Sequence, residues 1–350
     1  MFKLNKRQQL ILQMVDQQGI VSAKELLETL KLDFDRISKP TILRDLDLMM
    51  RKGLLVRTGG GRSVRYQSMI KNPLLGFVDI KEYFQADTDE RKVQEQFNWP
   101  VFDQLDDLFT KQESEHLNNL AKEYRDKISS LPEIILKKEF ERLAIELSWK
   151  SSRIEGNTYS LLETEHLIKE HQESLGHDRA EAVMILNHKR ALDYLRDNKS
   201  VFQKLSVSKI EDLHWLLLDG LGVSRKVRQV AVGIGGTKYS PPETEADVRR
   251  ALELTCRTVN KIADPFAKAL VTLSMLSYIQ PFEDGNKRTS RLVTNAILMA
   301  YDLCPLSYRN VKPVEYKKAV LLFYEQNKLS YLKQLFIEQF EFAVKNYFGK

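Results

Sequence analysis

The sequence predicts a mainly α-helical protein in two folded parts, an N-terminal winged helix-turn-helix domain and a larger helical domain interrupted by one β-hairpin. Three observations lead to this fold class. Apolar residues recur at helical spacing through most of the 350 residues. Capping signals of the form Ser-x-x-Glu open several of these segments. Alternating apolar residues beside glycines, the pattern of a hairpin, occur around residues 54–66 and 230–236.

The composition is that of an ordinary globular protein, with 43% hydrophobic and 29% charged residues, and the length accommodates two or three domains. No N-terminal stretch has the apolar region of a signal peptide, and the longest apolar runs fall short of a membrane span, so we expect no membrane partner. The two cysteines, Cys256 and Cys304, lie far apart and have no metal-ligand spacing. We therefore expect reduced core thiols in a cytoplasmic protein.

The positive charge is concentrated at the N-terminus. Residues 1–69 contain 13 Lys or Arg against 7 Asp or Glu, which accounts for the whole net charge of +6. The remainder of the chain is balanced. A polyanion is therefore the expected partner of the N-terminal fifth alone.

We predict a winged helix-turn-helix domain over residues 1–69. Helices are expected over residues 5–18, 22–30 and 38–50, the second opened by the capping box Ser22–Glu25. A basic hairpin follows over residues 54–66. The buried faces of the first and third helices are expected to comprise Leu10, Ile11, Met14 and Val15, and Leu43, Leu46, Met49 and Met50.

The segment Pro40-Thr41-Ile42-Leu43-Arg44-Asp45-Leu46 resembles the recognition helix of DeoR-type regulators. The resemblance implies double-stranded DNA as a partner, with Thr41 and Arg44 facing the groove and Arg57 and Arg62 on the phosphates. The alternative is a winged helix used for protein contact or dimerisation, and the pattern leaves open whether the chain is a homodimer.

A helical connector is expected over residues 70–131 and a third region over residues 132–350. Within them we predict helices over residues 116–129, 132–155 and 178–198. Two further helices should begin at the capping boxes Ser160–Glu163 and Ser208–Glu211.

The stretch from Gln280 to Arg291 lies between two solid apolar runs and reads Gln-Pro-Phe-Glu-Asp-Gly-Asn-Lys-Arg-Thr-Ser-Arg. Proline ends the first helix and the Gly-Asn turn begins the second, so backbone N–H groups lie at a helix N-terminus, where an anion binds readily. Lys287 and two arginines add positive charge, and Asp284 is the best-placed magnesium ligand in the loop. These features indicate a triphosphate site.

This stretch resembles the signature of the Fic family, His-Pro-Phe-x-Asp/Glu-Gly-Asn-Lys/Gly-Arg-x-x-Arg. Family members mostly transfer AMP from ATP to a Ser, Thr or Tyr hydroxyl of a protein, so the resemblance implies ATP, Mg²⁺ and a protein substrate. It also implies an all-helical Fic core over residues 132–350. The implied catalytic positions are Gln280, Asp284, Asn286, Arg288 and Arg291, with Asp284 on the metal. The implied nucleotide-binding positions are Gly285, Asn286, Lys287, Arg288 and Arg291.

Gln280 stands where the family has a His that takes the proton from the target hydroxyl. A Gln amide does not titrate near neutrality and cannot replace that base, a loss of about 10²–10⁴-fold in rate. We therefore expect the chain as given to be inactive. The sequence is equally compatible with a naturally degenerate member and with an introduced change at this position.

Two further segments match family features. Residues 151–156 read Ser-Ser-Arg-Ile-Glu-Gly, which resembles the inhibitory motif Ser/Thr-x-x-x-Glu-Gly/Asn, with Ser151 and Glu155 in the defining positions. In such members the Glu pairs with the last signature Arg, here Arg291, and displaces the γ-phosphate. The expected hairpin matches the family's flap, which aligns the target segment by strand addition; its docking residues would be Val232, Gly233, Ile234 and Gly235.

Two functions are therefore predicted. The first is a Fic-type AMP transferase, autoinhibited by Glu155 and silenced at Gln280. The second is a non-catalytic regulator in which ATP occupancy modulates DNA binding. Removal of AMP from a modified protein is a third reading, but family members doing this still use the His.

Overall fold

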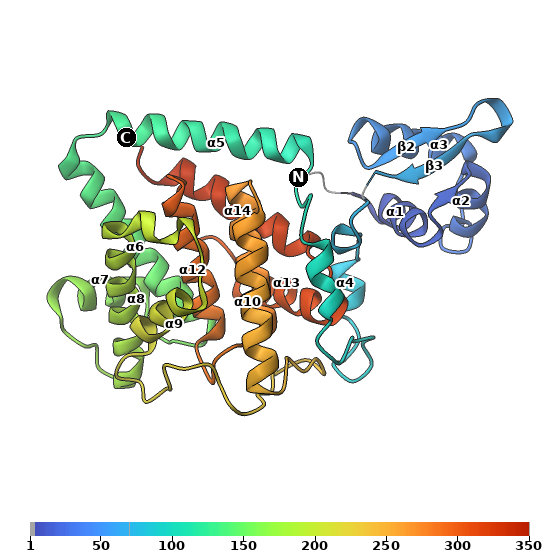
Figure 1. Cartoon of the computed structure of the whole chain (residues 1–350). Coiled ribbons are helices and arrows are strands. Elements are labelled where there is room, and N and C mark those ends of the chain that lie inside the picture. The colour runs from blue at the N-terminus through green and yellow to red at the C-terminus, as the bar shows by residue number, and fades with distance from the viewer. Residues whose placement is uncertain (1–3, 70, 350) are drawn as a thin grey trace. The chain divides into compact units, whose positions relative to one another are not determined.

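The computed structural model describes residues 4–69 and 71–349, apart from the side chains of Gln17 and Arg62. It divides into two compact units (Figure 1). Unit 1 comprises Met1–Arg91 with Asn327–Ser330, and unit 2 comprises Lys92–Gln326 with Tyr331–Lys350. The boundaries expected after residues 69 and 131 come from changes in sequence pattern and stay predictions.

Unit 1 contains the predicted winged helix. Its helices are α1 (Lys6–Gln18), α2 (Ala23–Leu30) and α3 (Lys39–Arg51). The strands β1 (Ile20–Val21), β2 (Leu55–Thr58) and β3 (Arg65–Ser68) form an antiparallel sheet in the order β1-β3-β2. Short elements complete the unit: η1 (Gly61–Ser63), η2 (Pro73–Leu75) and α4 (Ile80–Tyr83).

The first two helices each begin at a capping box; the box at Ser22 was predicted and is confirmed, whereas the one at Asn5 was not predicted. The Asn5 side chain accepts from the Gln8 backbone N–H, and the Ser22 hydroxyl accepts from that of Glu25, each completed into a capping box by the return bond. Both bonds are local, which is why three residues of sequence are enough to predict them.

The buried face of α3 differs from the prediction at one position. Leu43 is 40% exposed, whereas Ile42 and Asp45 are buried beside Leu46 and Met49. Asp45 is tolerated there because Arg7 and Gln8 of α1 both donate to its carboxylate, the latter at 2.9 Å. These long-range contacts of Asp45 leave no signal in an apolar pattern, which therefore placed Leu43 on the buried face.

Unit 2 is helical and surrounds the central pair α11 (Pro265–Ile279) and α12 (Asn286–Ala300). Every residue of α11 from Phe266 onward is buried. The pair packs directly against α10, α13, α9 and α8. The other elements are η3 (Trp99–Gln104), α5 (Lys111–Ser130), α6 (Glu133–Ile154), α7 (Leu161–Glu170), α8 (Arg179–Asp197), η4 (Lys199–Gln203), α9 (Val207–Leu218), α10 (Glu245–Lys261), α13 (Pro313–Gln326) and α14 (Ser330–Asn346).

Two predictions for unit 2 need correction. Helix α9 is capped by Ser206, whose hydroxyl accepts from the Lys209 backbone N–H, so the cap lies two residues before the expected Ser208. The β-hairpin expected at residues 230–236 is not formed: Gly235 and Gly236 make a turn, but residues 231–239 contain no strand. Alternating residues form a strand only where a second strand pairs with them, and three glycines weaken the pairing further.

Among the residues described, none of the helices combines the length and apolar character needed to cross a bilayer.

Candidate active site

The loop between α11 and α12 is held by a backbone bond at its first end and by a side chain at its second. Gln280 ends α11 in the left-handed region, with φ 48° and ψ 61°, and its N–H donates to the Leu276 carbonyl at 3.2 Å. Asn286 closes the loop: its side chain accepts from the Phe282 N–H at 2.8 Å and donates to the Phe282 carbonyl at 2.7 Å. The loop is therefore rigid before any ligand binds.

His214 of α9 supports the same loop. Its ring stacks on Phe282 with centroids 3.6 Å apart, and its Nε2 lies 3.0 Å from the Asp284 carbonyl oxygen. Burial lowers the pKa of His214 to about 4. The neutral ring therefore donates from Nε2 to that carbonyl at physiological pH, a positioning contact and not a substitute base.

Gly285 begins α12 with φ 76°, and a Cβ there would lie 2.8 Å from Cδ2 of the buried Leu218. We expect Gly285→Ala to lower the free energy of unfolding by about 1–3 kcal/mol more than Gly222→Ala. Gly222 has nearly the same φ, 70°, with open space around it, so it isolates the clash from the backbone strain. Urea unfolding of both variants measures the difference. Equal losses of unfolding free energy would contradict the close contact between residue 285 and Leu218.

Arg288 is 3% exposed, and only one of its two terminal nitrogens is paired within the described residues. Nη2 donates to Asp284 Oδ2 at 2.9 Å, whereas Nη1 is buried without a hydrogen-bond partner. An unmet buried donor costs about 1–3 kcal/mol, so an acceptor is missing at this point. Asp284 itself has a 66% exposed side chain.

Arg291 joins α12 to the end of α6. It is fully buried and donates from Nε to the Ser151 hydroxyl at 3.0 Å, from Nη2 to the Ser151 carbonyl at 2.9 Å and from Nη1 to Glu155 Oε1 at 2.9 Å. The structure thus brings Ser151, Glu155 and Arg291 together, although 136 residues separate the last two. Lys287, the remaining signature cation, is half-buried on α12.

The charge balance favours an ionised Glu155. Burial acts to raise the pKa of its carboxyl, but the charges of Arg291, Lys287 and Arg288 and the hydrogen bond from Arg291 prevail and lower it. Because the folded-state pKa is depressed, the pair contributes its stability above the ordinary pKa of 4.5 and loses it as the pH falls through the lower folded value.

The Gln280 side chain is 7% exposed and already engaged. Its Nε2 donates to the Ser277 carbonyl at 2.6 Å and to the Tyr324 hydroxyl at 3.1 Å. The amide is therefore held against α11 and α13, and it offers no group that titrates near pH 7.

Arg228 fastens the segment after α9 to this loop. It is 1% exposed; its Nε donates to the Gln280 carbonyl at 2.7 Å and its other nitrogens to the carbonyls of Val230 and Pro242. Burial lowers the pKa of this guanidinium. Residues 231–239, where the flap was expected, therefore start from a fixed point beside Gln280, with Val232 and Ile234 half-buried and Gly233 and Gly235 exposed.

Comparison with known proteins agrees with this geometry. Residues 204–298 match the model of the Fic/DOC family, and residues 7–67 match that of the DeoR-like helix-turn-helix domain. The chain contains a Fic domain. Among the described residues, this domain holds the whole loop, Arg228 and His214, while Ser151 and Glu155 reach it from α6, upstream of the matched region.

Several relatives of this Fic domain are named protein adenylyltransferases. One, from Nematostella vectensis, is 27% identical over 207 residues, which are 57% of this chain and 48% of the relative. A probable protein adenylyltransferase of Aquifex aeolicus is 28% identical over 134 residues, 35% of this chain and 42% of the relative. The chain therefore spans less than half the length of these two relatives.

Solved structures show the same fold. Fic-1 of C. elegans superimposes with a TM-score of 0.56 at 20% identity, covering 67% of this chain and 70% of that one. A Fic family protein of Desulfovibrio desulfuricans gives a TM-score of 0.54 at 20% identity, covering 68% and 74%. At this identity the likeness establishes the Fic fold alone.

A magnesium site in the Fic domain would rest on one carboxylate. The described residues contain no group of three or more His, Cys, Asp or Glu able to hold a metal. Asp284 nonetheless fits the usual arrangement of Mg²⁺, one protein carboxylate plus nucleotide phosphates, because its exposed oxygens retain free lone pairs beside Arg288 and the Gly285 N–H.

Three contributors to the Fic domain site were missed in the sequence: Arg228, His214 and Tyr324. None belongs to a motif, and each reaches the loop from another element, so no signal in the sequence identifies them. Tyr316 is a core residue: it is 1% exposed, and the Arg291 Cζ lies 5.3 Å from its ring centroid.

The predicted DNA contacts lie on unit 1. Arg44 and Arg57 are exposed and Thr41 is half-buried, with its hydroxyl 2.9 Å from that of Ser38. The side chain of Arg62 lies outside the described residues.

Proposed function

We propose that this chain is a Fic-type protein adenylyltransferase, held inactive by Glu155 on Arg291 and by Gln280 in place of a base. The unpaired, buried Nη1 of Arg288 carries the proposal. A phosphate oxygen is the acceptor that best satisfies a guanidinium donor, and the first N–H groups of α12 lie in the same place. The proposed site residues are those expected from the sequence, over a Fic region of residues 132–350.

In the proposed site each group has a separate task. The turn at Gly285 and Asn286 would hold the phosphates against the N-terminus of α12, and Arg288 would bind an outer phosphate. Asp284 would hold Mg²⁺, which would neutralise charge on the phosphates. A Ser, Thr or Tyr hydroxyl of the protein substrate would attack the α-phosphorus beside residue 280.

Glu155 would oppose this arrangement by occupying Arg291. Ser151 and Glu155 already hold the guanidinium, and the Glu155 carboxylate on Nη1 would repel a γ-phosphate there, so the triphosphate would bind in a pose unsuited to attack. The flap segment would align the substrate chain, with strand addition at Val232, Gly233, Ile234 and Gly235. Because residues 231–239 contain no strand in the structure, the strand would form there only when the substrate pairs with it.

Transfer of labelled AMP from ATP tests the proposal, in a chain carrying Gln280→His and Glu155→Gly. Incorporation into the chain itself or into a lysate protein is the expected result. A chain that binds ATP and magnesium but labels nothing would refute it.

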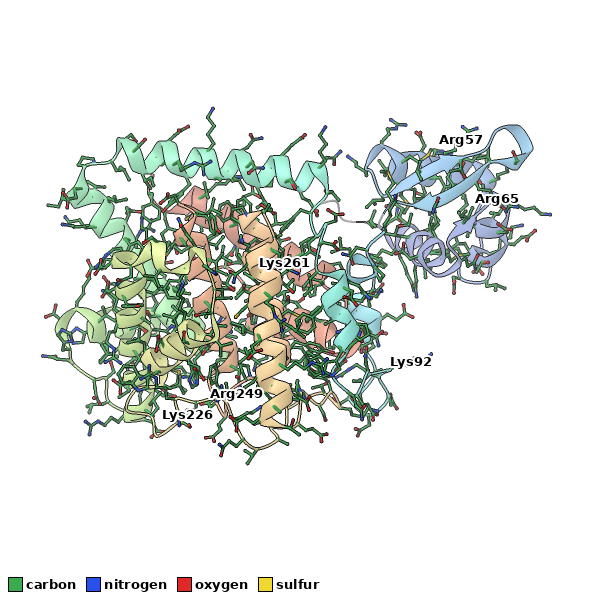
Figure 2. The ribbon with its side chains drawn as sticks, in the orientation of Figure 1. Arg57, Arg65, Lys92, Lys226, Arg249 and Lys261 are labelled. Carbon is green, nitrogen blue, oxygen red and sulfur yellow. The ribbon has the colours of Figure 1, made fainter. Side chains whose placement is uncertain are left out.

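A second function, DNA binding regulated by ATP, is supported by the DeoR-like match and by the basic wing. Arg57 and Arg65 project from β2 and β3 (Figure 2), and because Arg57 is opposite Tyr66 they lie on different faces. Arg65 is neutralised by Glu25, which accepts from it at 2.9 Å, whereas Arg57 has no ion-pair partner in the described part of the chain.

We expect Arg57→Ala to flatten the slope of log affinity against log salt by about one, since one phosphate contact is lost. Arg65→Ala is the matched control, and its slope should stay close to the parent value because Glu25 already neutralises that charge. Titration of a labelled duplex at several salt concentrations measures both. Equal slopes in the parent and Arg57→Ala would assign the wing to another partner.

A further inference from the structure

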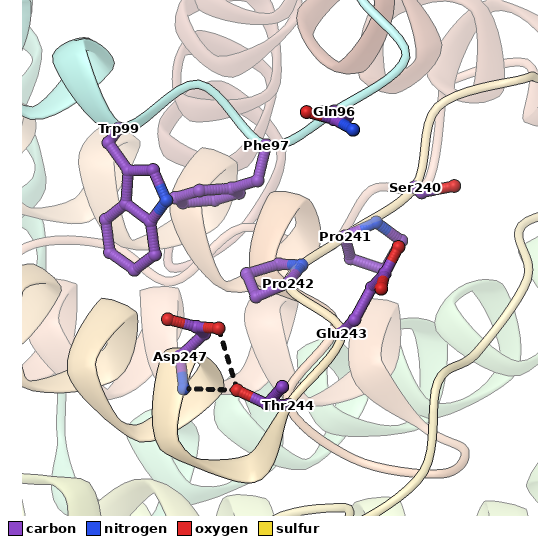
Figure 3. Close-up of a pocket in the computed structure, with 9 residues that line it drawn as sticks. All are labelled: Gln96, Phe97, Trp99, Ser240, Pro241, Pro242, Glu243, Thr244 and Asp247. Carbon is purple, nitrogen blue, oxygen red and sulfur yellow. Dashed lines mark hydrogen bonds between the residues drawn. The ribbon is translucent and has the colours of Figure 1, made fainter.

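A pocket of about 240 Å³ opens where the segment before η3 meets the segment before α10 (Figure 3). Phe97 and Trp99 form one side, and Pro241 and Pro242 form the other. Two carboxylates complete the lining: Glu243, just before the N-cap of α10, and Asp247 in its first turn. The pocket lies entirely within unit 2 and contains none of the residues assigned above to nucleotide binding.

The pocket is fixed to the end of the flap segment. The Ser240 N–H donates to the Glu95 carbonyl at 2.7 Å, and Gln96 pairs with Ser240 in a parallel bridge. Residues 231–239 thus run from Arg228 at one end to the pocket at the other. A substrate chain paired along residues 237–239, after the turn at Gly235 and Gly236, would lead to the pocket.

The pocket is also fixed to the catalytic loop. Phe97 stacks on Tyr278 of α11 with centroids 4.7 Å apart, two residues before Gln280. One guanidinium, that of Arg228, donates both to the Gln280 carbonyl and to the Pro242 carbonyl. The pocket wall therefore lies next to residue 280. A side chain bound in the pocket would then belong to a residue near the acceptor hydroxyl in the substrate sequence.

The chemistry of the lining suits a cation. Flat aromatic and proline surfaces stack on guanidinium and long methylene stems, and the two carboxylates supply opposite charge. Glu243 is exposed and has no ion-pair partner among the described residues, whereas Asp247 accepts from the Thr244 hydroxyl at 2.7 Å. The Trp99 ring already carries a cation of this chain, since the Arg250 carbon lies 4.5 Å from its centroid.

We propose that this pocket receives an Arg or Lys side chain of the protein substrate and so selects hydroxyls with a basic residue nearby. The inference rests on the proposed transferase function, because the pocket matters only if a substrate chain lies along the flap. The two carboxylates favour a basic occupant over a proline-rich one, which the aromatic and proline walls alone would also suit.

Binding is measured first, on the full parent chain, with peptides that contain one Ser and one variable residue in a neutral polar background. The arginine peptide should bind about tenfold more tightly than its alanine counterpart. Glu243→Lys should remove that preference and favour the glutamate peptide. Glu253→Lys changes an exposed acidic residue of α10 outside the pocket and should leave the preference unchanged. Equal binding of all peptides, or preference for proline, overturns the inference.

Transfer is then measured with the same peptides on the chain carrying Gln280→His and Glu155→Gly. A preference of about tenfold in kcat/KM for the arginine peptide, lost in Glu243→Lys, supports the inference. Self-labelling without any peptide preference overturns the pocket's role and leaves the transferase function standing. Absence of self-labelling refutes that function instead, and peptide binding then decides on the pocket alone.

Discussion

Replacing Gln280 by His and Glu155 by Gly together should raise AMP incorporation by roughly 10³-fold or more over the parent chain. The two changes correct different defects of the parent chain: the missing base and the position of the phosphates. The His supplies a base for the acceptor hydroxyl, and its backbone can adopt the left-handed conformation observed at Gln280, a region in which His is enriched. The Gly releases Arg291 from its bond to Glu155 and leaves a donor for the γ-phosphate.

Each single change should restore little. Gln280→His alone leaves Arg291 occupied, so the phosphates stay misaligned, at a cost of about 10²-fold. Glu155→Gly alone should change how ATP binds but still lacks a base. Transfer from ATP labelled at the α-phosphate compares the parent, both singles and the double.

The matched control is Gln280→Asn with Glu155→Gly. Asn fits the left-handed backbone at least as well as His but has no group that titrates near neutrality, so this chain should label as poorly as Glu155→Gly alone. Labelling as strong as that of the His variant would mean that residue 280 is not the base position.

Arg288→Ala should weaken ATP binding by about 10²-fold in Kd, the loss expected when charge-assisted hydrogen bonds to phosphate disappear. The buried Nη1 has no partner among the described residues, so the parent gains a bond on binding that the variant cannot make. Arg288→Lys should recover part of the affinity, because it keeps the charge but not the two-pronged geometry. Calorimetry with ATP and magnesium measures all three.

Arg257→Ala is the control for net charge, since Arg257 is an exposed arginine of the same unit without an ion-pair partner among its described residues. Its isotherm should match the parent. An unchanged isotherm for a folded Arg288→Ala chain would show that the phosphate site lies elsewhere.

The sequence alone determined the features that depend on neighbouring residues. The capping boxes at Ser22 and Ser160 and the start of α12 at the Gly-Asn turn follow from bonds that span three or four positions, and the wing pairs β2 with β3, the next strand in the chain. The order of the signature from Pro281 to Arg291 likewise indicated a phosphate loop before any contact was known. Such patterns can be predicted from the sequence because the groups that interact are close together in the chain.

Only the tertiary structure decided what meets the loop from elsewhere. It brought Glu155 of α6 onto Arg291, His214 of α9 under Phe282, and Arg228 between the carbonyls of Gln280 and Pro242. It also left residues 231–239 without a strand where alternation predicted a hairpin, and buried Asp45 where the pattern preferred Leu43. The Asp45 and Glu155 contacts join residues 37 and 136 positions apart, and the approach of such partners is set by the packing of whole helices and leaves no periodic trace in the sequence.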